Sequence, residues 1–170
     1  MGTTAAREWK NPDKAPKSKI ARLNSVRVLN ADNQIAQTVD IRHPVTLEMN
    51  YDVMEADHLL LPHFRLANDR GDCIFVTVDQ DSQWRGRRRP AGNYVNQVEI
   101  PGNLLAEGLV IVNCNLITLN PDSLVFTARS VVSFNVVDSM EGNSARGDFA
   151  KNMPGIVRPK LKWKTDYSKN

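Results

Sequence analysis

The 170-residue sequence predicts an all-β fold, an antiparallel β-sandwich or jelly roll. Apolar residues recur at every second position in short runs, which is the period of a half-buried strand, and helical spacing is scarce. Turn residues separate these runs with almost no helix between them, whereas parallel pairing of successive strands would need crossover helices. A chain of this length folds as one domain, because it buries roughly two-thirds of its unfolded surface.

About eight strands are expected in order along the chain. The clearest is 45–53, where Val45, Leu47 and Met49 share one face and Thr46 and Glu48 share the other. A Gly-containing turn joins a hairpin, and the turn at 120–123 joins the last two strands. The other expected strands cover 20–30, 35–41, 59–69, 73–80, 94–101, 109–120 and 128–138.

The remaining segments suggest how the chain is organised. We expect 1–19 to be a linker or an expression remnant and 20–138 to be the sandwich. The polar, Gly-punctuated stretch 139–155 predicts a flexible linker, followed by a C-terminal strand and tail over 156–170. That strand can pair with its own sheet or be exchanged with a second subunit, which would form a dimer.

The charge distribution argues against a nucleic-acid partner. The net charge is +3, but residues 1–27 and 146–170 hold 14 of the 22 Lys and Arg and only 4 of the 19 Asp and Glu. The middle of the chain therefore has 8 bases against 15 acids, whereas a nucleic-acid binder places its basic residues on the folded surface.

Cysteine usage and hydropathy predict a cytoplasmic chain. Cys73 and Cys114 match no metal-binding spacing, and both are expected to be buried thiols. The first residues lack the apolar stretch of a signal peptide, and no run approaches the roughly 18 residues of a membrane span.

Catalytic and cofactor motifs are not found, so we expect no cofactor and no metal. The sequence contains no phosphate-binding GxxxxGK loop, no GxGxxG, no GxSxG and no HExxH. The three histidines stand at no spacing that places two ligands on one helix face. Carboxylates such as Glu48, Asp52 and Asp79 raise glycoside cleavage as an alternative, although acids on a wet sheet face are usually only solvated.

Alternation along the strands instead predicts a binding surface for a hydroxyl-rich ligand. The outward positions carry short or planar groups with fixed hydrogen-bonding directions, and Trp84 offers a ring on which a sugar can stack. The long loop at 81–93 adds an Arg-rich run, which is either a solvated loop or a contact for an anionic group. The expected site comprises Glu48, Asn50, His63, Arg65, Thr77, Asp79, Trp84, Arg85, Asn113 and Asn115.

Several motifs in this order resemble a known family. They are VTLEMNYDV, the hairpin PHFRLANDRGDCIF, the connector VEIPGNLLAEGLVIVN, the strand SVVSFNVVD and the closing GIVRPKLKW. Together, across about 20–163, they resemble the carboxy-terminal domain of Wzt, the ATP-binding subunit of transporters that export O-antigen polysaccharide. The connector and the closing stretch are the most specific parts.

The resemblance implies an immunoglobulin-like sandwich that recognises the modified non-reducing end of a finished glycan and couples recognition to export. It also implies a homodimer, a partner in the membrane subunit of the transporter, and a place at the cytoplasmic face of the inner membrane. The nucleotide-binding half is not in this sequence. The family does not assign pocket residues, because its members read different polymers, so the expected site rests on alternation alone.

Two other functions stay open at this point. One is a protein-interaction sandwich whose face or exposed edge strand pairs with a partner. The other is a sugar-processing enzyme that uses Glu48 and Asp79.

Overall fold

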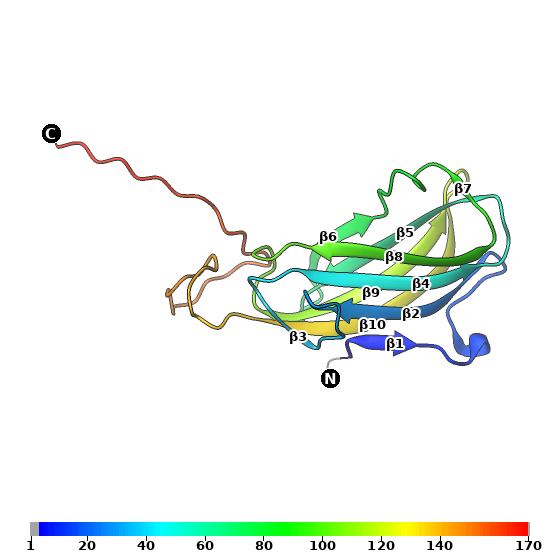
Figure 1. Cartoon of the computed structure of the whole chain (residues 1–170), viewed down its shortest axis with the longest axis horizontal. Coiled ribbons are helices and arrows are strands. Elements are labelled where there is room, and N and C mark those ends of the chain that lie inside the picture. Colours follow the sequence, from blue (N-terminus) through cyan, green and yellow to red (C-terminus); the bar gives the residue numbers. More distant parts are fainter. Residues whose placement is uncertain (1–3, 170) are drawn as a thin grey trace.

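The computed structural model describes residues 4–169 as two packed β-sheets with one short 3₁₀ turn, η1 (Pro12–Lys14) (Figure 1). Sheet A has the order β1-β2-β4-β8, and sheet B has the order β3-β10-β9-β5-β6, with the two-residue β7 beside β5. Sheet A consists of β1 (Ala6–Glu8), β2 (Ala21–Leu29), β4 (Val45–Val53) and β8 (Gly92–Ile100). Sheet B consists of β3 (Thr38–Asp40), β10 (Ser123–Val137), β9 (Gly108–Thr118), β5 (His58–Ala67) and β6 (Cys73–Val78), with β7 (Arg88–Arg89).

The predicted sandwich is confirmed, with one parallel exception. All pairs are antiparallel except β3 with β10, which run parallel. The crossover rule applies to successive strands, but β3 and β10 lie far apart in the sequence. The chain between them supplies the reversal without a crossover helix.

The core lies between the sheets, where alternation places it. The five inward residues of β4, from Val45 to Val53, are at most 3% exposed, as the alternation predicts. Sheet B contributes Phe64, Leu66 and Phe134 from the opposite side. Burying each such side chain contributes about 1.5–3 kcal/mol, so the two inner faces hold the sheets together.

Part of the expected N-terminal linker belongs to the sandwich. Ala6–Glu8 forms β1 and pairs with β2, and the backbone N–H of Val28 donates to the carbonyl of Ala5, which is buried. The prediction that all of 1–19 is linker is therefore wrong for these residues. Three residues are too few to show a period of two, which is why the sequence pattern missed this strand.

The expected C-terminal strand is absent from the chain's own sheets. Val157 makes one isolated bridge with Leu105, and the backbone N–H groups of Arg158 and Lys160 donate to the carbonyls of Leu104 and Asn103. Residues 159–169 form no strand and are exposed, with Trp163 91% exposed. Lys residues alternate with Leu161 and Trp163 in this tail, so its apolar face is narrow and does not cover a sheet in the same chain. Exchange of the segment with a second subunit stays a prediction.

The expected linker at 139–155 contains no helix or strand, but ion pairs attach it to the rest of the domain. Glu107, just before β9, accepts a 2.8 Å bond from Arg146 and pairs with the buried Arg158. Both guanidinium groups therefore bind one carboxylate, which ties the segment to the connector between β8 and β9. Burial lowers the pKa of Arg158.

That connector also depends on one glycine. A Cβ at Gly102 would lie 2.1 Å from the carbonyl oxygen of Arg42, so the two backbones approach too closely for any side chain. The contact fixes the end of β8 against the loop after β3. The first glycine of the IPGNLLAEG stretch thus has a packing role.

The two cysteines differ in environment. Cys114 lies in the middle of β9 and is fully buried, as predicted, and burial raises the pKa of its thiol to about 12. Cys73 is exposed, so the prediction for it is wrong. It begins β6, the edge strand of sheet B, where a register irregularity interrupts the pairing with β5. Within residues 4–169, no helix has the length and hydropathy needed to span a membrane.

Candidate functional site

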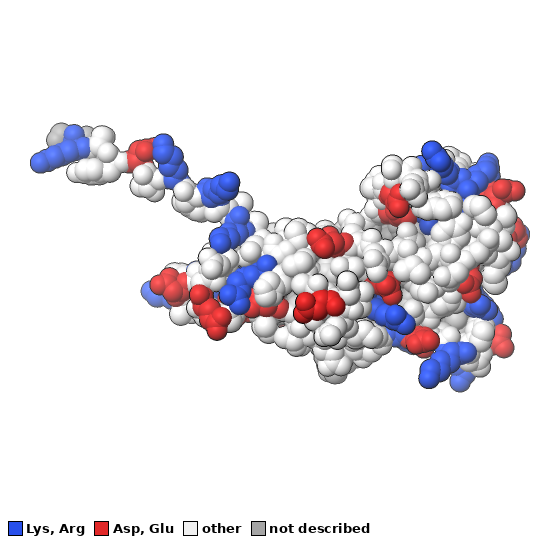
Figure 2. Space-filling view, in the orientation of Figure 1, with Lys and Arg blue, Asp and Glu red and all other residues white. Residues whose placement is uncertain are grey.

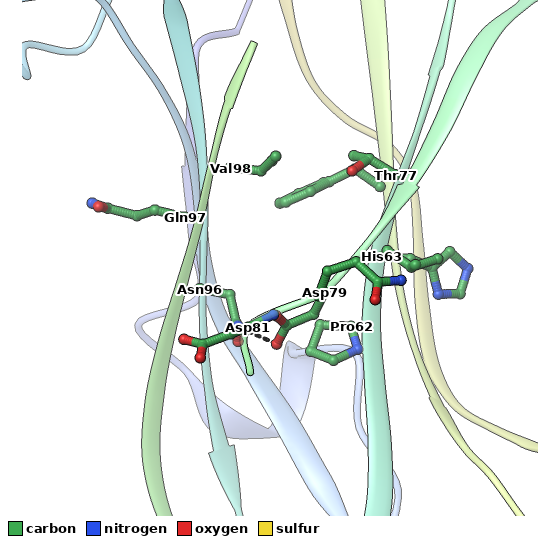
Figure 3. A pocket seen from close by; sticks show the side chains of 11 residues that line it. Pro62, His63, Thr77, Asp79, Asp81, Asn96, Gln97 and Val98 are labelled. Carbon is green, nitrogen blue, oxygen red and sulfur yellow. Dashed lines mark hydrogen bonds between the residues drawn. The ribbon is translucent and has the colours of Figure 1, made fainter. Parts of the chain in front are cut away.

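A groove opens where the two sheets end side by side. Sheet A ends in β8 and sheet B in β6, and these edge strands do not pair with each other. A cavity of about 430 Å³ lies between them, and a second of about 280 Å³ adjoins it, since Thr77 and Val98 line both. We call this continuous hollow the edge groove (Figure 3).

Register explains which side chains enter the edge groove. Asn96 and Val98 of β8 stand opposite the buried Met49 and Leu47, so they face inward. Thr77 of β6 stands opposite the buried Phe64, so it also faces inward. Figure 3 shows Thr77 and Val98 pointing into the space between the sheets, whereas Gln97 and His63 point away from it. The groove therefore has an apolar floor with a few polar groups at fixed positions.

Asp79 is the most firmly held polar group in the edge groove. Its Oδ2 accepts 2.8 Å hydrogen bonds from Asn96 Nδ2 and from Arg89 Nη2, and its Oδ1 accepts one from the backbone of Asp81. The side chain of Asp79 is 11% exposed. Its carboxylate is thus fixed and charge-balanced while part of it still reaches the cavity. Asp81, at the rim, is exposed.

Behind Asp79, three aromatic rings surround the buried Arg89: Tyr51 is buried, and Trp84 and Tyr94 are partly exposed. Arg89 is 1% exposed and donates to the hydroxyl of Tyr51 as well as to Asp79. Its guanidinium carbon lies 5.6 Å from the Trp84 ring centroid and 5.3 Å from that of Tyr94, which are cation–π contacts. Burial raises the pKa of Tyr51, so the phenol stays neutral and can accept the bond from Arg89.

The Arg-rich run has two environments that the sequence does not separate. Arg89 is buried, whereas Arg85, Arg87 and Arg88 are exposed. Trp84 is partly exposed and meets Tyr94 edge-on, with 5.2 Å between ring centroids. It therefore folds back onto the end of the sandwich, leaving part of its surface open.

The ten predicted site residues do not share one face, so the premise of a single docking surface is wrong. The outer face of sheet B carries His63, Arg65, Asn113 and Asn115, and the outer face of sheet A carries Glu48 and Asn50. The edge groove contains Thr77 and Asp79, and the loop after β6 contains Trp84 and Arg85. Alternation fixes the two faces of each strand but not which sheet the strand joins.

On sheet A, the two predicted residues belong to a network that satisfies itself. Glu48 accepts a 2.8 Å bond from Gln97 and pairs with Arg27 at 3.6 Å. The Oδ1 of Asn50 accepts from Asn24 and from Asn93. Because Glu48 faces outward from sheet A and Asp79 lies between the sheets, these two carboxylates do not flank a common site. The glycoside-cleaving alternative loses its proposed pair.

On sheet B, the four outward residues stand in two adjacent rows. His63 is paired with Asn115, and Arg65 with Asn113. Asn113 holds the bulge of β10, since its Oδ1 accepts from the backbone N–H of Ser130 at 2.8 Å. Asn115 Oδ1 accepts from Thr127 at 2.6 Å. Both amide oxygens are therefore used within the sheet.

The sequence argument missed Asn96 and Arg89. The signal for Asn96 was present, because alternation in YVNQVEI places it on the same face as Tyr94, Val98 and Ile100. A polar residue on an otherwise apolar face marks a buried hydrogen bond or a site. Nothing local in the sequence distinguishes Arg89 from its neighbouring arginines. In the described residues, no group of three His, Cys, Asp or Glu is arranged to hold a metal ion.

The fold and groove define the chain as a two-sheet β-sandwich with a ligand-sized hollow along its open edge. No protein-family model and no curated protein matches the sequence. Among solved structures, the crystal structure of the C-terminal domain of wzt matches with a TM-score of 0.70 at 13% identity, covering 98% of this chain and 92% of that one. The chain thus shares the fold of that domain, and the fold expected from the resemblance is confirmed.

A further match is the crystal structure of a putative beta-galactosidase from bacteroides fragilis. Its TM-score is 0.37 at 12% identity, and the match covers 61% of this chain and 15% of that one. This likeness is too weak to support an argument about function.

Proposed function

We propose that this chain is a non-catalytic carbohydrate-binding module and that the edge groove holds the glycan. The observation that carries the proposal is a cavity of about 430 Å³ with an apolar floor and a few convergent polar groups. Ligand pockets typically have this composition, since apolar contact supplies affinity and fixed polar groups supply orientation. Sugar rings present both apolar C–H faces and directional hydroxyls.

Each side chain has a role in this proposal. Asp79 accepts hydrogen bonds from sugar hydroxyls, and Thr77 both donates and accepts. Val98 contacts a C–H face of the ring. Arg89 and Asn96 hold the Asp79 carboxylate by 2.8 Å bonds, so the acceptor does not have to be ordered when the ligand binds. Trp84, which is partly exposed, offers a second contact at the loop.

We further propose that the glycan is an O-antigen polysaccharide recognised at its modified non-reducing end, and that recognition is coupled to export by an ABC transporter. The fold shared with the C-terminal domain of wzt supports this assignment, together with the motifs over 98–113 and 155–163. In such a transporter the domain works at the cytoplasmic face of the inner membrane, with the membrane subunit as a partner of the full-length protein.

A homodimer belongs to the same proposal. Residues 159–169 of the C-terminal tail are exposed, and Leu161, Trp163 and Tyr167 are 68%, 91% and 86% exposed. Figure 2 shows basic side chains along the same tail. A segment that alternates apolar and basic residues suits addition to a sheet edge of a second copy.

Titration with O-polysaccharides that carry or lack end modifications tests the proposal, with Asn96→Ala as the groove variant and Gln97→Ala as its control. The two positions are adjacent, but Asn96 faces the groove and Gln97 faces outward (Figure 3). We expect Asn96→Ala to weaken binding roughly tenfold and Gln97→Ala to change it less than about twofold. Equal affinities for Asn96→Ala and the parent, with both folded by circular dichroism, would remove the edge groove as the site.

A further inference from the structure

The outer face of sheet B has an unusual charge composition. Four strands of sheet B, β5, β6, β9 and β10, contain no Asp or Glu, yet they carry Arg65, Arg129 and His63 on the outward side. The one acid in the strands of this sheet, Asp40 of β3, is already bonded to Arg42. Each long strand of sheet A contains a charged side chain, and on its outer face Arg22 and Arg27 pair with Asp52 and Glu48. The two outer faces therefore differ, because only one balances its charges internally.

Register brings the two arginines of sheet B into one row. Arg65 on β5 stands opposite Asn113 on β9. On the other side, Asn113 accepts from Ser130, in the β10 bulge that follows Arg129. Arg129 is exposed and is the next outward position after Thr127, which pairs with Asn115. Two strand spacings separate the arginines, roughly 10 Å between backbones, so their long side chains can converge.

The free hydrogen-bonding groups in this row are donors. Among residues 4–169, the guanidinium groups of Arg65 and Arg129 take part in no ion pair or hydrogen bond. The amide oxygens of Asn113 and Asn115 are already occupied by Ser130 and Thr127. A face that offers unpaired guanidinium donors without carboxylates nearby is complementary to anionic oxygen atoms.

We propose that this face, defined by Arg65, Asn113, Asn115 and Arg129 and called the cationic face, binds carboxylate or phosphate groups of an anionic polysaccharide. The inference rests on the proposed glycan-binding function and adds a second contact, because the cationic face lies on the opposite side of β5 from the edge groove. Guanidinium groups bind planar carboxylates and phosphates through two parallel hydrogen bonds. The cationic face selects charged polymers, and the edge groove binds sugar hydroxyls.

The test compares three probes of equal length: an oligogalacturonate, a phosphorylated oligomannoside and an unmodified oligomannoside. The variant is Arg65→Gln with Arg129→Gln. The matched control is Lys14→Gln with Arg87→Gln, which removes two exposed charges outside the expected site that are also unpaired among the described residues. Affinities are measured by calorimetry at low and high salt, and backbone NMR shifts locate each contact.

We expect the Arg65/Arg129 double variant to bind the anionic probes at least tenfold more weakly and to lose most of the salt dependence, while the Lys14/Arg87 control variant stays within about threefold of the parent. If the double variant loses affinity for only one anionic probe, the cationic face binds the group that this probe carries, carboxylate or phosphate. Binding of the unmodified oligomannoside should not change in either variant. Asn96→Ala should weaken binding of all three probes, which separates the edge groove from the cationic face.

The proposal is overturned if the double variant binds both anionic probes as tightly as the parent. It is also overturned if the double variant loses only its binding to phosphatidylglycerol vesicles, which would assign the face to a membrane surface. A change in sedimentation from dimer to monomer without loss of anion affinity would assign it to self-association. If the unmodified probe fails to bind the parent while the anionic probes bind through Arg65 and Arg129, the groove proposal fails and the cationic face stands.

Discussion

Replacement of Arg89 by Met tests the physical account of the site most directly. The guanidinium of Arg89 is 1% exposed, and the Asp79 carboxylate that it binds is 11% exposed, so both charges lie largely out of water. Removing one partner of such a pair leaves an unbalanced buried charge, which costs about 3–5 kcal/mol. Met fills much of the same volume, so the loss measures mainly charge and hydrogen bonding.

Two features of the structure determine where the loss of stability falls within this range of about 3–5 kcal/mol. Asp79 keeps its bonds from Asn96 and from the backbone of Asp81, which favours the lower end. Tyr51 loses its donor and Trp84 loses a cation–π contact, which together cost about 1–2 kcal/mol. We therefore expect Arg89→Met to lower the free energy of unfolding by about 4 kcal/mol, a large share of the roughly 5–15 kcal/mol typical of a domain.

Urea denaturation followed by far-UV circular dichroism measures this loss. With a slope of about 2 kcal/mol per molar urea, the midpoint should fall by roughly 2 M. Arg89→Lys should lose about half as much, because an ammonium keeps the charge but lacks the planar fork that reaches both Tyr51 and Asp79. Arg89→Met combined with Asp79→Asn should be more stable than the sum of the single losses by at least about 1 kcal/mol.

An Arg89→Met protein whose free energy of unfolding lies within about 1 kcal/mol of the parent's would show that the Arg89–Asp79 pair does not stabilise the fold. If Arg89→Met does not fold, the stability of Arg89→Lys is the test instead. A lysine variant as stable as the parent would show that the planar geometry of the guanidinium does not contribute to stability.

Three further predictions follow from the packing and titration of single residues. Gly102→Ala should destabilise the fold by at least about 2 kcal/mol in urea melts, because its Cβ would lie 2.1 Å from the Arg42 carbonyl oxygen; an unchanged midpoint would contradict this. Asp40→Asn should lower the free energy of unfolding by about 1 kcal/mol at pH 7, because the hydrogen bond from the Arg42 side chain lowers the pKa of Asp40 from 3.8 to about 2. The stability difference between parent and variant should vanish as the pH falls from 3.8 to about 2, since the carboxylate then protonates. A stability difference that persists at pH 2 would rule this out. With a thiol reagent at pH 8, Cys73 should react at once and Cys114 only on unfolding, since burial raises the pKa of the Cys114 thiol to about 12; two fast thiols in the folded protein would show the burial to be wrong.

Some residues of the candidate site could be predicted from the sequence, and others could not. Thr77 and Asp79 were among the expected residues and do lie in the edge groove. Asn96 could have been found from its apolar neighbours at positions 94, 98 and 100. Arg89 could not be found in this way, because it is one of four arginines within five residues. Its burial depends on the pairing of the two-residue strand β7 with β5, which the sequence pattern does not indicate.

Local alternation was enough to predict the long strands and their inward residues, because a period of two gives each such strand one apolar face that must be buried. It therefore predicted the core side of β4 correctly. Which sheet each strand joins depends on long-range pairing, and this pairing separated Glu48 from His63 and Asp79. Local periodicity carries no information about long-range pairing. The hollow between β6 and β8 exists because these two strands, distant in the sequence, end neighbouring sheets without pairing to each other.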